Sequence, residues 1–432
     1  MFPPSHETSV VRSSLTSPRR PVVVVGGGVV GAASAYYLAT AGAPVVLIEK
    51  GEFGQGCSHG NCGYVSPSHI LPLCRPGAVT DSLKTLLRKN SPFQLRFRFD
   101  LDFFSWLWRF ARRCNQIDML QSGQARHALL QSSRTLFDEL FAAKVLDDCD
   151  WETRGLLFVY QGQRHFEHYA KTDELLRKEF GLGATPWKES ELLEREPSLL
   201  PGVAGAWMYE CDAHLRPDKL MSAWRRRLEQ SGVTIREHCE LVGVEEGEHS
   251  VSALMTSVGR VEVDQVIFAT GAWSRLLQTE LKAKIPIEPG KGYSITMPRP
   301  AICPKYPMIF EQHRVAVTPM QSGYRLGSTM EFAGFDTSLK ESRLSLLTDG
   351  AKIYLKDPVA EPVVEKWYGW RPMSCDGVPL IGRLPQFRNA WMAAGHSMLG
   401  LSMSTGTGKL ISELVTGKHP HIDPHPYRLD RF

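Results

Sequence analysis

A glycine-rich hexapeptide that follows a run of valines has the spacing of a phosphate-binding loop. Its glycines fall in the pattern G-x-G-x-x-G. Gly26 permits a sharp turn, Gly28 lets a pyrophosphate approach the backbone, and Gly31 allows a helix to lie close to a sheet. The N–H groups at the start of that helix, at Val29 and Val30, have no partner inside the helix and attract an anion. The pattern predicts a dinucleotide site, and a glycine turn that serves packing alone is the alternative.

The loop needs a strand before it and a helix after it. Residues 22–25 are four valines, small residues at helical spacing follow the glycines, and residues 45–48 are a second apolar, mostly β-branched run. The whole uncharged stretch is long enough to span a membrane, but the glycine cluster divides it into strand, turn, helix and strand. Glu49 ends the second strand about 20 residues beyond the loop, where a carboxylate can accept hydrogen bonds from ribose hydroxyls, and Lys50 follows it. FAD and NAD present the same half to such a site, so the loop does not separate them.

Composition excludes several classes of protein. The chain has 432 residues, of which 43% are hydrophobic and 22% charged, which indicates a substantial core and two or three domains. Its 50 basic and 46 acidic residues do not give the concentrated positive charge of a nucleic-acid binder. Nine cysteines without a C-x-x-C pair indicate reduced thiols and a cytoplasmic protein. Residues 1–20 are expected to be a disordered tail, with a mitochondrial presequence as the alternative.

Further segments are expected to surround the cofactor or to form a second domain. A strand at 266–268 runs into a small-residue turn containing Gly271, placed to pass under a cofactor, and a strand at 389–394 precedes a glycine-rich turn and a helix at about 406–415. Residues 81–113 are rich in aromatic and basic side chains. They are predicted to form a core helix, and a helix lying on a membrane surface is the alternative.

No metal site is expected. His419, His421 and His425 alternate with other residues that include prolines, and no cysteine or carboxylate cluster completes a coordination shell. Cys57, His59 and Cys62 fit no zinc spacing and are interpreted as small or polar neighbours of a cofactor.

Five ordered motifs give the sequence a family resemblance. Between Pro21 and about Pro420 it resembles the D-amino-acid dehydrogenase branch of the FAD-dependent amine and amino-acid oxidoreductases, the larger group that includes D-amino-acid oxidase, glycine oxidase and sarcosine oxidase. The motifs are the dinucleotide loop, Cys57 to Pro67, Pro289 to Ser294, Gly369 to Met373 with Asp376 and Gly377, and Gly395 to Gly400.

The resemblance implies an α/β fold of two interleaved domains. A Rossmann-like FAD-binding domain would comprise residues 21–90, 203–283 and 366–432. An α+β substrate domain built on an antiparallel sheet would comprise residues 91–202 and 284–365. FAD would be held non-covalently, because no cysteine matches a flavin-linking position.

The resemblance also implies roles for particular residues around FAD. Those expected near the flavin or the adenine are Ser58, Asn61, Val242, Val244, Gly395, Leu399, Gly400 and Ser402. Arg371 falls where the family places the arginine that binds the substrate carboxylate, a role that suits a planar, permanently charged guanidinium. Tyr293, His313 and His396 are expected to line the substrate site.

The expected reaction is oxidation of a D-amino acid. Hydride passes from Cα of the neutral amine to flavin N5, which needs no strong base, and gives an imino acid or, after hydrolysis, a 2-oxo acid. Cys57, His59 and Cys62 replace the family's more usual Thr, Phe and Ala, and the nearest subgroup acts on cyclic substrates such as D-proline or cis-4-hydroxy-D-proline. The alternatives are a glycine- or sarcosine-type amine oxidase and a non-catalytic FAD-holding subunit of a membrane complex. The electron acceptor, oxygen or a quinone of the respiratory chain, and the oligomeric state stay open, as does peripheral contact with the inner face of the membrane.

Overall fold

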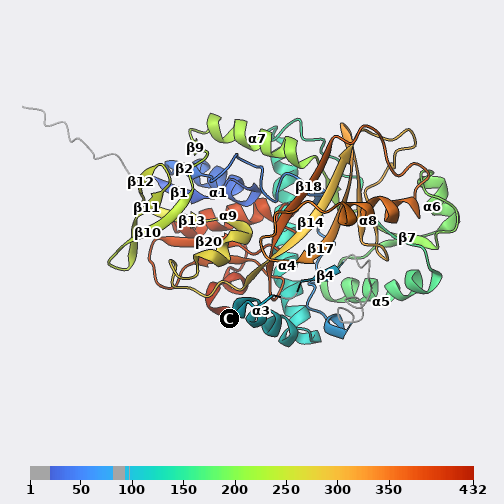
Figure 1. Ribbon diagram of the computed structural model, residues 1–432, viewed down its shortest axis with the longest axis horizontal. Coiled ribbons are helices and arrows are strands. Elements are labelled where there is room, and N and C mark those ends of the chain that lie inside the picture. Colours follow the sequence, from blue (N-terminus) through green and yellow to red (C-terminus); the bar gives the residue numbers. More distant parts are fainter. Residues whose placement is uncertain (1–19, 81–92, 97) are drawn as a thin grey trace, which may run out of the picture.

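A computed structural model describes residues 20–80, 93–96 and 98–432. Two sheets dominate it, a six-stranded one with parallel strands at its centre and a nine-stranded, mainly antiparallel one (Figure 1). The predicted tail at 1–20 lies outside the described residues except for its last residue, as do residues 81–92 and 97 of the predicted aromatic helix. The two sheets confirm the predicted fold class.

The six-stranded sheet is assembled from distant parts of the chain, in the order β19-β20-β13-β1-β2-β9. All its neighbouring strands are parallel except β19, which is antiparallel to β20. Its strands are β1 (Val22–Val25), β2 (Val45–Ile48), β9 (Thr234–Arg236), β13 (Gln265–Phe268), β19 (Leu380–Arg383) and β20 (Ala390–Ala394). The strands predicted from the valine runs and from 389–394 are confirmed.

Both faces of this sheet are covered, which explains its uninterrupted apolar strands. Val22 and Val24 face a core formed with four helices, whereas Val23 and Val25 face a small antiparallel sheet. The helices are α1 (Val29–Thr40), α4 (Gln116–Ala142), α7 (Pro217–Gln230) and α9 (Ser404–Thr416). The small sheet contains β10 (Leu241–Gly247), β11 (Ser250–Thr256) and β12 (Gly259–Glu262).

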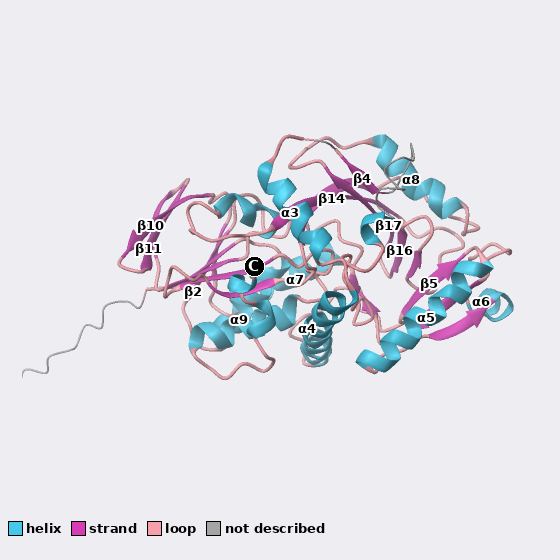
Figure 2. Ribbon diagram, turned by 90° about the horizontal axis from the view of Figure 1, so that it is seen from below, coloured by secondary structure: helices cyan, strands magenta, loops and turns pink. Residues whose placement is uncertain are grey.

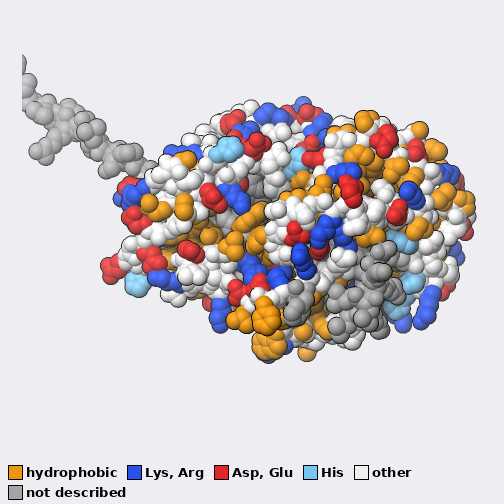
Figure 3. Space-filling model, in the orientation of Figure 1, with side chains coloured by type: hydrophobic (Ala, Val, Ile, Leu, Met, Phe, Trp, Pro, Cys, Tyr) orange, Lys and Arg blue, Asp and Glu red, His pale blue; other side chains and the backbone are white. Residues whose placement is uncertain are grey.

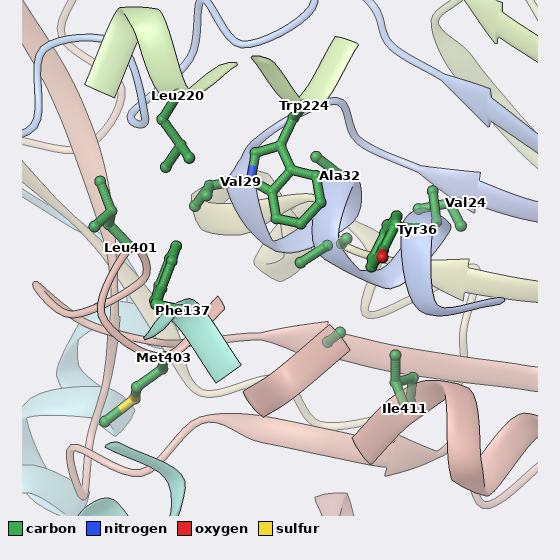
Figure 4. Close-up of a cluster of buried hydrophobic side chains, with 14 of the residues drawn as sticks. Val24, Val29, Ala32, Tyr36, Phe137, Leu220, Trp224, Leu401, Met403 and Ile411 are labelled. Carbon is green, nitrogen blue, oxygen red and sulfur yellow. The ribbon is translucent and has the colours of Figure 1, made fainter. Parts of the chain in front are cut away.

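Glycine and alanine let helix α1 pack unusually close to its neighbours. A Cβ atom added to Gly31 would lie 1.9 Å from the carbonyl oxygen of Gly26, and one added to Gly408 of α9 would lie 2.6 Å from the carbonyl carbon of Ala33. Figure 4 shows Tyr36 of α1 beside Trp224 of α7 in the same core. The predicted packing role of Gly31 is therefore visible in the fold.

Helix α4 also contributes to this core, through Leu129, Phe137 and Leu140. The predicted boundaries assign this helix to the substrate domain, whereas its apolar face packs on α9 beneath the six-stranded sheet. The boundaries stay a prediction.

The nine-stranded sheet lies beside the first sheet and is covered on one face by α8 (Figure 2). Its strands are β4 (Phe93–Leu95), β5 (Leu156–Tyr160), β6 (Thr185–Lys188), β7 (Gly205–Tyr209), β14 (Ile287–Met297), β15 (Met308–Phe310), β16 (Val315–Met320), β17 (Gly323–Phe332) and β18 (Glu365–Ser374). Helices α5 (Gln163–Phe180), α6 (Glu189–Arg195) and α8 (Glu341–Lys352) accompany it. A two-stranded ribbon pairs β3 (Tyr64–Val65) with β8 (Ala213–His214). Short 3₁₀ helices are η1 (Gly271–Leu277), η2 (His425–Tyr427) and η3 (Leu429–Arg431).

Helix α3 (Leu101–Arg112) has one buried face and one exposed face. Phe103 and Trp106 are buried, and the indole N–H of Trp106 donates to the carbonyl oxygen of Met373 at 2.9 Å. On the other face Leu101 is 82% and Trp108 is 57% exposed. The prediction of a core helix within 81–113 thus holds for only one face of α3, because the opposite face is exposed. Across residues 20–80, 93–96 and 98–432, every helix is too short or too polar to cross a membrane.

Candidate functional site

A cavity of about 670 Å³ lies where the carboxyl ends of the parallel strands approach strand β18. This is the edge at which open α/β sheets bind ligands, because the strand-to-helix loops converge there. The residues predicted from sequence that line it are Gly26, Gly28, Val29, Val30, Glu49, Lys50, Ser58, Asn61, Gly271, Arg371, His396 and Gly400. The cavity therefore joins the phosphate-binding loop and the predicted carboxylate-binding arginine in one space.

The glycine loop is built to receive an anion at the start of α1. Gly26 has φ +113°, and a Cβ atom there would lie 2.5 Å from the carbonyl oxygen of Ala269. Gly28 has ordinary extended geometry, and a Cβ atom there would meet nothing closer than Ser58 Oγ at 3.4 Å. The first turn of α1 carries no acidic residue, so its positive dipole end is open to the cavity. Glycine is thus required at position 26 by the backbone conformation and packing, whereas at position 28 it keeps space free for a ligand.

Polar side chains fix the loop in position. The N–H of Gly27 donates to Glu49 Oε2 at 2.6 Å, and the N–H of Val29 donates to Ser58 Oγ at 3.0 Å. Glu49 also accepts from the N–H of Gly51 at 3.0 Å. Glu49 therefore lines the cavity as a carboxylate oriented by two backbone groups.

Near the start of β10, the residues that line the cavity precede the predicted ones. Val242 is 68% exposed, Val244 packs against the core, and neither lines the cavity. The cavity is lined instead by Cys239, Glu240 and Leu241, at the start of β10. Cys239 and Glu240 precede β10, so the segment that enters the strand borders the cavity and the middle of the strand does not.

The loop after β20 frames the opposite end of the cavity. Ser397 has φ +53°, a left-handed conformation that is uncommon for serine, and its N–H donates to the carbonyl oxygen of Pro372 at 2.9 Å. Gly395, Leu399 and Ser402 do not line the cavity. Leu399 is buried in the core, and Ser402 Oγ donates to the carbonyl oxygen of Tyr64 at 2.8 Å. These three residues support the loop.

His396 lines the cavity as a neutral side chain. Its Nε2 lies 2.9 Å from Thr407 Oγ1, and burial lowers its pKa to about 3. At neutral pH the ring is therefore uncharged.

Arg371 is held by backbone carbonyl groups. Its Nη1 donates to the carbonyl oxygen of Thr329 at 2.7 Å and its Nη2 to that of Ser328 at 3.4 Å. Both residues have positive φ, +121° for Ser328 and +51° for Thr329. Burial lowers the pKa of Arg371 from its ordinary value, and among the described residues no Asp or Glu lies within 4.0 Å of its guanidinium. The guanidinium is oriented while its charge stays available to an anion.

Tyr293 and His313 do not line the cavity. Tyr293 pairs with Tyr368, so it projects from the sheet face opposite to that of Gly292 and Gly369, and its hydroxyl donates to Glu331 Oε2 at 2.9 Å. His313 is hydrogen-bonded to the hydroxyl of Tyr354 at 2.9 Å. The structure does not bring these two predicted residues into the cavity that Arg371 lines.

Sequence reasoning missed the aromatic wall of the cavity. Trp367, Tyr368 and Trp370 of β18 line it together with Trp273 of η1, whose ring centroid lies 3.8 Å from Lys50 Nζ. Because side chains alternate along a strand, Trp367, four residues before Arg371, is expected on the same face of β18 and could have been predicted.

Comparison with known proteins identifies the family. Residues 21–414 match the profile described as FAD dependent oxidoreductase. The chain belongs to this family. A D-amino acid dehydrogenase of Paramagnetospirillum magneticum is 31% identical over 418 residues, covering 92% of this chain and 96% of the relative. A glycine oxidase from Geobacillus kaustophilus has the same fold, with a TM-score of 0.76, 23% identity and coverage of 95% and 98%. An L-proline dehydrogenase from P. horikoshii has a TM-score of 0.70, 21% identity and coverage of 95% and 98%.

The residues of the cavity fit the family's cofactor, FAD. The acid-free start of α1, the space kept open by Gly28 and the carboxylate of Glu49 match a pyrophosphate and a ribose. The loop from His396 to Leu401 and strand β18 enclose the other end, where the isoalloxazine ring would lie. The protein is an FAD-dependent oxidoreductase.

Proposed function

We propose that this protein is a D-amino-acid dehydrogenase in which Arg371 binds the substrate carboxylate. The observation that carries the proposal is a guanidinium oriented by two backbone carbonyl groups, without an Asp or Glu within 4.0 Å among the described residues, at the β18 side of the cofactor cavity. Similarity to D-amino acid dehydrogenases over 92% of the chain supports this substrate class.

The site supplies orientation and charge. When bound, FAD accepts the two electrons that leave the substrate, so the reaction needs no strong base at Cα. Arg371 fixes the carboxylate and with it the direction of the Cα–H bond. Cys57, whose pKa burial raises to about 11, and His396 are both neutral at pH 7 and place no competing charge beside that arginine.

The deciding experiment is anaerobic mixing of the FAD-loaded protein with D-amino acids. We expect loss of the oxidised flavin absorbance with D-amino acids and no loss with their L enantiomers. Arg371→Ala and Arg371→Lys should retain FAD but reduce kcat/KM by about a hundredfold or more, because bidentate binding of the carboxylate is lost. An unbleached wild type would refute the proposed function, and near-normal kinetics of both variants would refute the role of Arg371.

Within this class, we favour cyclic substrates such as D-proline and cis-4-hydroxy-D-proline. The support is the replacement of the family's usual Thr, Phe and Ala by Cys57, His59 and Cys62, of which Cys57 lines the cavity. A panel containing D-proline, cis-4-hydroxy-D-proline, D-alanine and sarcosine tests it. A preference for sarcosine, with hydrogen peroxide release, would instead favour the amine-oxidase alternative.

The mode of FAD binding and the electron acceptor belong to the same proposal. We expect acid or heat to release FAD from the chain, since the cavity holds it through backbone and hydrogen-bonding groups; flavin that stays on the denatured chain would contradict this. We propose a quinone as acceptor, which a comparison of quinone and oxygen turnover tests.

A membrane-soluble acceptor would be reached through the exposed face of α3. Leu101, Trp108 and Ile117 of the following helix are 82%, 57% and 70% exposed, and Arg112 stacks on Trp108 with Cζ 4.7 Å from the ring centroid. Figure 3 shows hydrophobic side chains gathered over this helix with basic ones beside them. Apolar side chains flanked by arginine suit an anionic phospholipid surface.

Vesicle sedimentation tests this surface. The double variant Leu101→Ser/Trp108→Ser should lose binding to phosphatidylglycerol vesicles, whereas Val258→Ser, a residue 66% exposed on the distant small sheet, should not. Equal sedimentation of all three proteins would refute the membrane contact.

A further inference from the structure

We infer that Trp367 forms the wall against which the substrate side chain packs, and that this wall selects D-amino acids with uncharged, apolar side chains. The inference rests on the proposed function and extends it from the carboxylate to the rest of the substrate. Five residues carry it. They are Trp367 and Arg371 of β18, Gly60 and Gly369 beside the indole, and Gly292 beside the guanidinium.

The indole of Trp367 lies between two glycines. A Cβ atom at Gly60 would lie 2.1 Å from ring atoms Cδ2 and Cε3, and one at Gly369 would lie 2.1 Å from Cη2. No other residue type fits at either position without moving the ring. The ring therefore contacts the loop that carries Ser58 through Gly60 and its own strand β18 through Gly369, and it lines the cavity.

Arg371 lies over the neighbouring strand in the same manner. A Cβ atom at Gly292 of β14 would lie 2.3 Å from Cζ of Arg371. Gly292 and Gly369 are directly paired across β14 and β18. Paired Cα atoms in an antiparallel sheet are about 5 Å apart, so the tip of the indole and the guanidinium lie over adjacent positions of the same sheet face.

This spacing places the substrate side chain on the indole. A carboxylate bound to Arg371 leaves the remaining carbon atoms of a small amino acid within reach of a surface about 5 Å away. That surface is apolar, and Cys57, which also lines the cavity, is a neutral thiol. Burial of apolar side-chain area on the ring is the interaction available there.

Charge around the cavity opposes basic side chains. The carboxylates that line it, Glu49, Glu52 and Glu240, belong to the nucleotide end, beside the glycine loop and the start of β10. The lining residue next to the wall is Lys366, whose Nζ pairs with Glu341 Oε1 at 2.8 Å. A D-lysine or D-arginine side chain would therefore lose water without gaining a partner.

Three variants test the wall. Trp367→Ala removes it, and we expect the ratio of kcat/KM for D-proline to that for D-alanine to fall about tenfold, the value of roughly one or two buried methylene groups. Trp367→Phe keeps an apolar ring and should stay within about threefold of the wild-type ratio. Gly369→Ala displaces the ring into the cavity and should weaken D-proline oxidation more than D-alanine oxidation.

A binding measurement separates packing from turnover. Cyclohexanecarboxylate and acetate both carry a carboxylate and neither can be oxidised at a Cα–N bond. Flavin absorbance changes should show cyclohexanecarboxylate binding tighter than acetate to the wild type, with the difference reduced about tenfold in Trp367→Ala. The FAD content of each variant, read from its spectrum, should equal that of the wild type.

The outcomes distinguish this inference from the proposed function. A wild type that no D-amino acid bleaches defeats the proposed function itself. A wild type that oxidises D-amino acids, with unchanged selectivity and unchanged carboxylate binding in Trp367→Ala, defeats the wall alone. Oxidation of D-lysine or D-arginine at rates equal to those of D-proline also defeats it.

Discussion

The glycines of the first loop have different physical roles, although the sequence pattern treats them alike. Gly26 and Gly31 are required by the chain itself, because a side chain at either would collide with backbone atoms. Gly28 is required only by a ligand, because its Cβ position is open except for Ser58 Oγ at 3.4 Å. A substitution at Gly28 can thus separate cofactor binding from folding.

We expect Gly28→Val to fold and to lose FAD. Its branched side chain would occupy the space into which the pyrophosphate fits, at a cost of about 1–3 kcal/mol, or about 5- to 150-fold in FAD affinity. Flavin content after reconstitution and the circular dichroism of the apoprotein measure the two effects. A yellow, fully loaded Gly28→Val would contradict the role of the loop.

The matched comparison is Gly31→Ala. Its Cβ atom would lie 1.9 Å from the carbonyl oxygen of Gly26, so this smaller change should reduce the yield of folded protein. A stable, folded Gly31→Ala would show that the helix can move away from the sheet.

Only some of the site residues predicted from sequence line the cavity. Gly28, Ser58 and Arg371 all line the cavity, as predicted. Val242 and Tyr293 do not line it, since a motif does not show which residues of a strand reach a cavity. Trp367 was not singled out by any motif, and it is positioned by Gly60 in a distant segment and by Gly369 on its own strand.

At the scale of elements, the predicted strands and helices around the cofactor are confirmed with small shifts. The helix predicted at about 406–415 is α9 (Ser404–Thr416). Continuous apolar runs bounded by glycine make such elements recognisable. The environment of helix α3 could not be predicted from its sequence. Its alternation of buried Trp106 and exposed Trp108 is typical of a core helix and of an interfacial helix alike.

The close contact between α1 and α9 requires glycine at position 408, where any other residue would add a Cβ atom. A Cβ atom at Gly408 would lie 2.6–2.9 Å from three atoms of Ala33, two of them backbone. We expect Gly408→Ala to lower the free energy of unfolding by about 1–3 kcal/mol because the helices must separate. Thermal unfolding of the FAD-loaded protein measures this as a lower Tm.

Gly243→Ala in β10 is the matched control for that change. Its added Cβ atom would have nothing within 4 Å, so the Tm should stay within about 1 °C of the wild type. Equal effects of the two substitutions would show that the helix contact is not the cause.

At the scale of the whole molecule, buried ionisable groups make stability depend on pH. Burial lowers the pKa of His396 to about 3 in the folded state, below its ordinary value of about 6.5. Between these values the unfolded chain binds the proton and the folded chain does not, so this group's contribution is complete above about pH 6.5 and is lost as the pH falls. Asp212, whose pKa burial raises to about 6, has the opposite dependence.

His396→Gln isolates the histidine. Glutamine keeps a hydrogen-bonding group near Thr407 but does not titrate, so the loss of unfolding free energy from pH 7 to pH 5 should be about 2 kcal/mol smaller in the variant. Urea unfolding at the two pH values measures both proteins. Identical pH dependence would mean that His396 is not held neutral in the folded state.

The interleaving of two domains was expected from family resemblance and not from any local pattern. Sequence periodicity identifies single strands, whereas the order β19-β20-β13-β1-β2-β9 depends on pairings between residues hundreds of positions apart. Helix α4 illustrates the limit, because its apolar face fits either side of the predicted boundary until its partner α9 is known.

That strand order determines when the protein can bind its cofactor during synthesis. Strand β13 is incomplete on one side until β20 pairs with it, and the loop that follows β20 forms part of the cofactor cavity. Almost the entire polypeptide must therefore be synthesised before FAD can bind. Nascent chains stalled before residue 390 should contain no bound flavin.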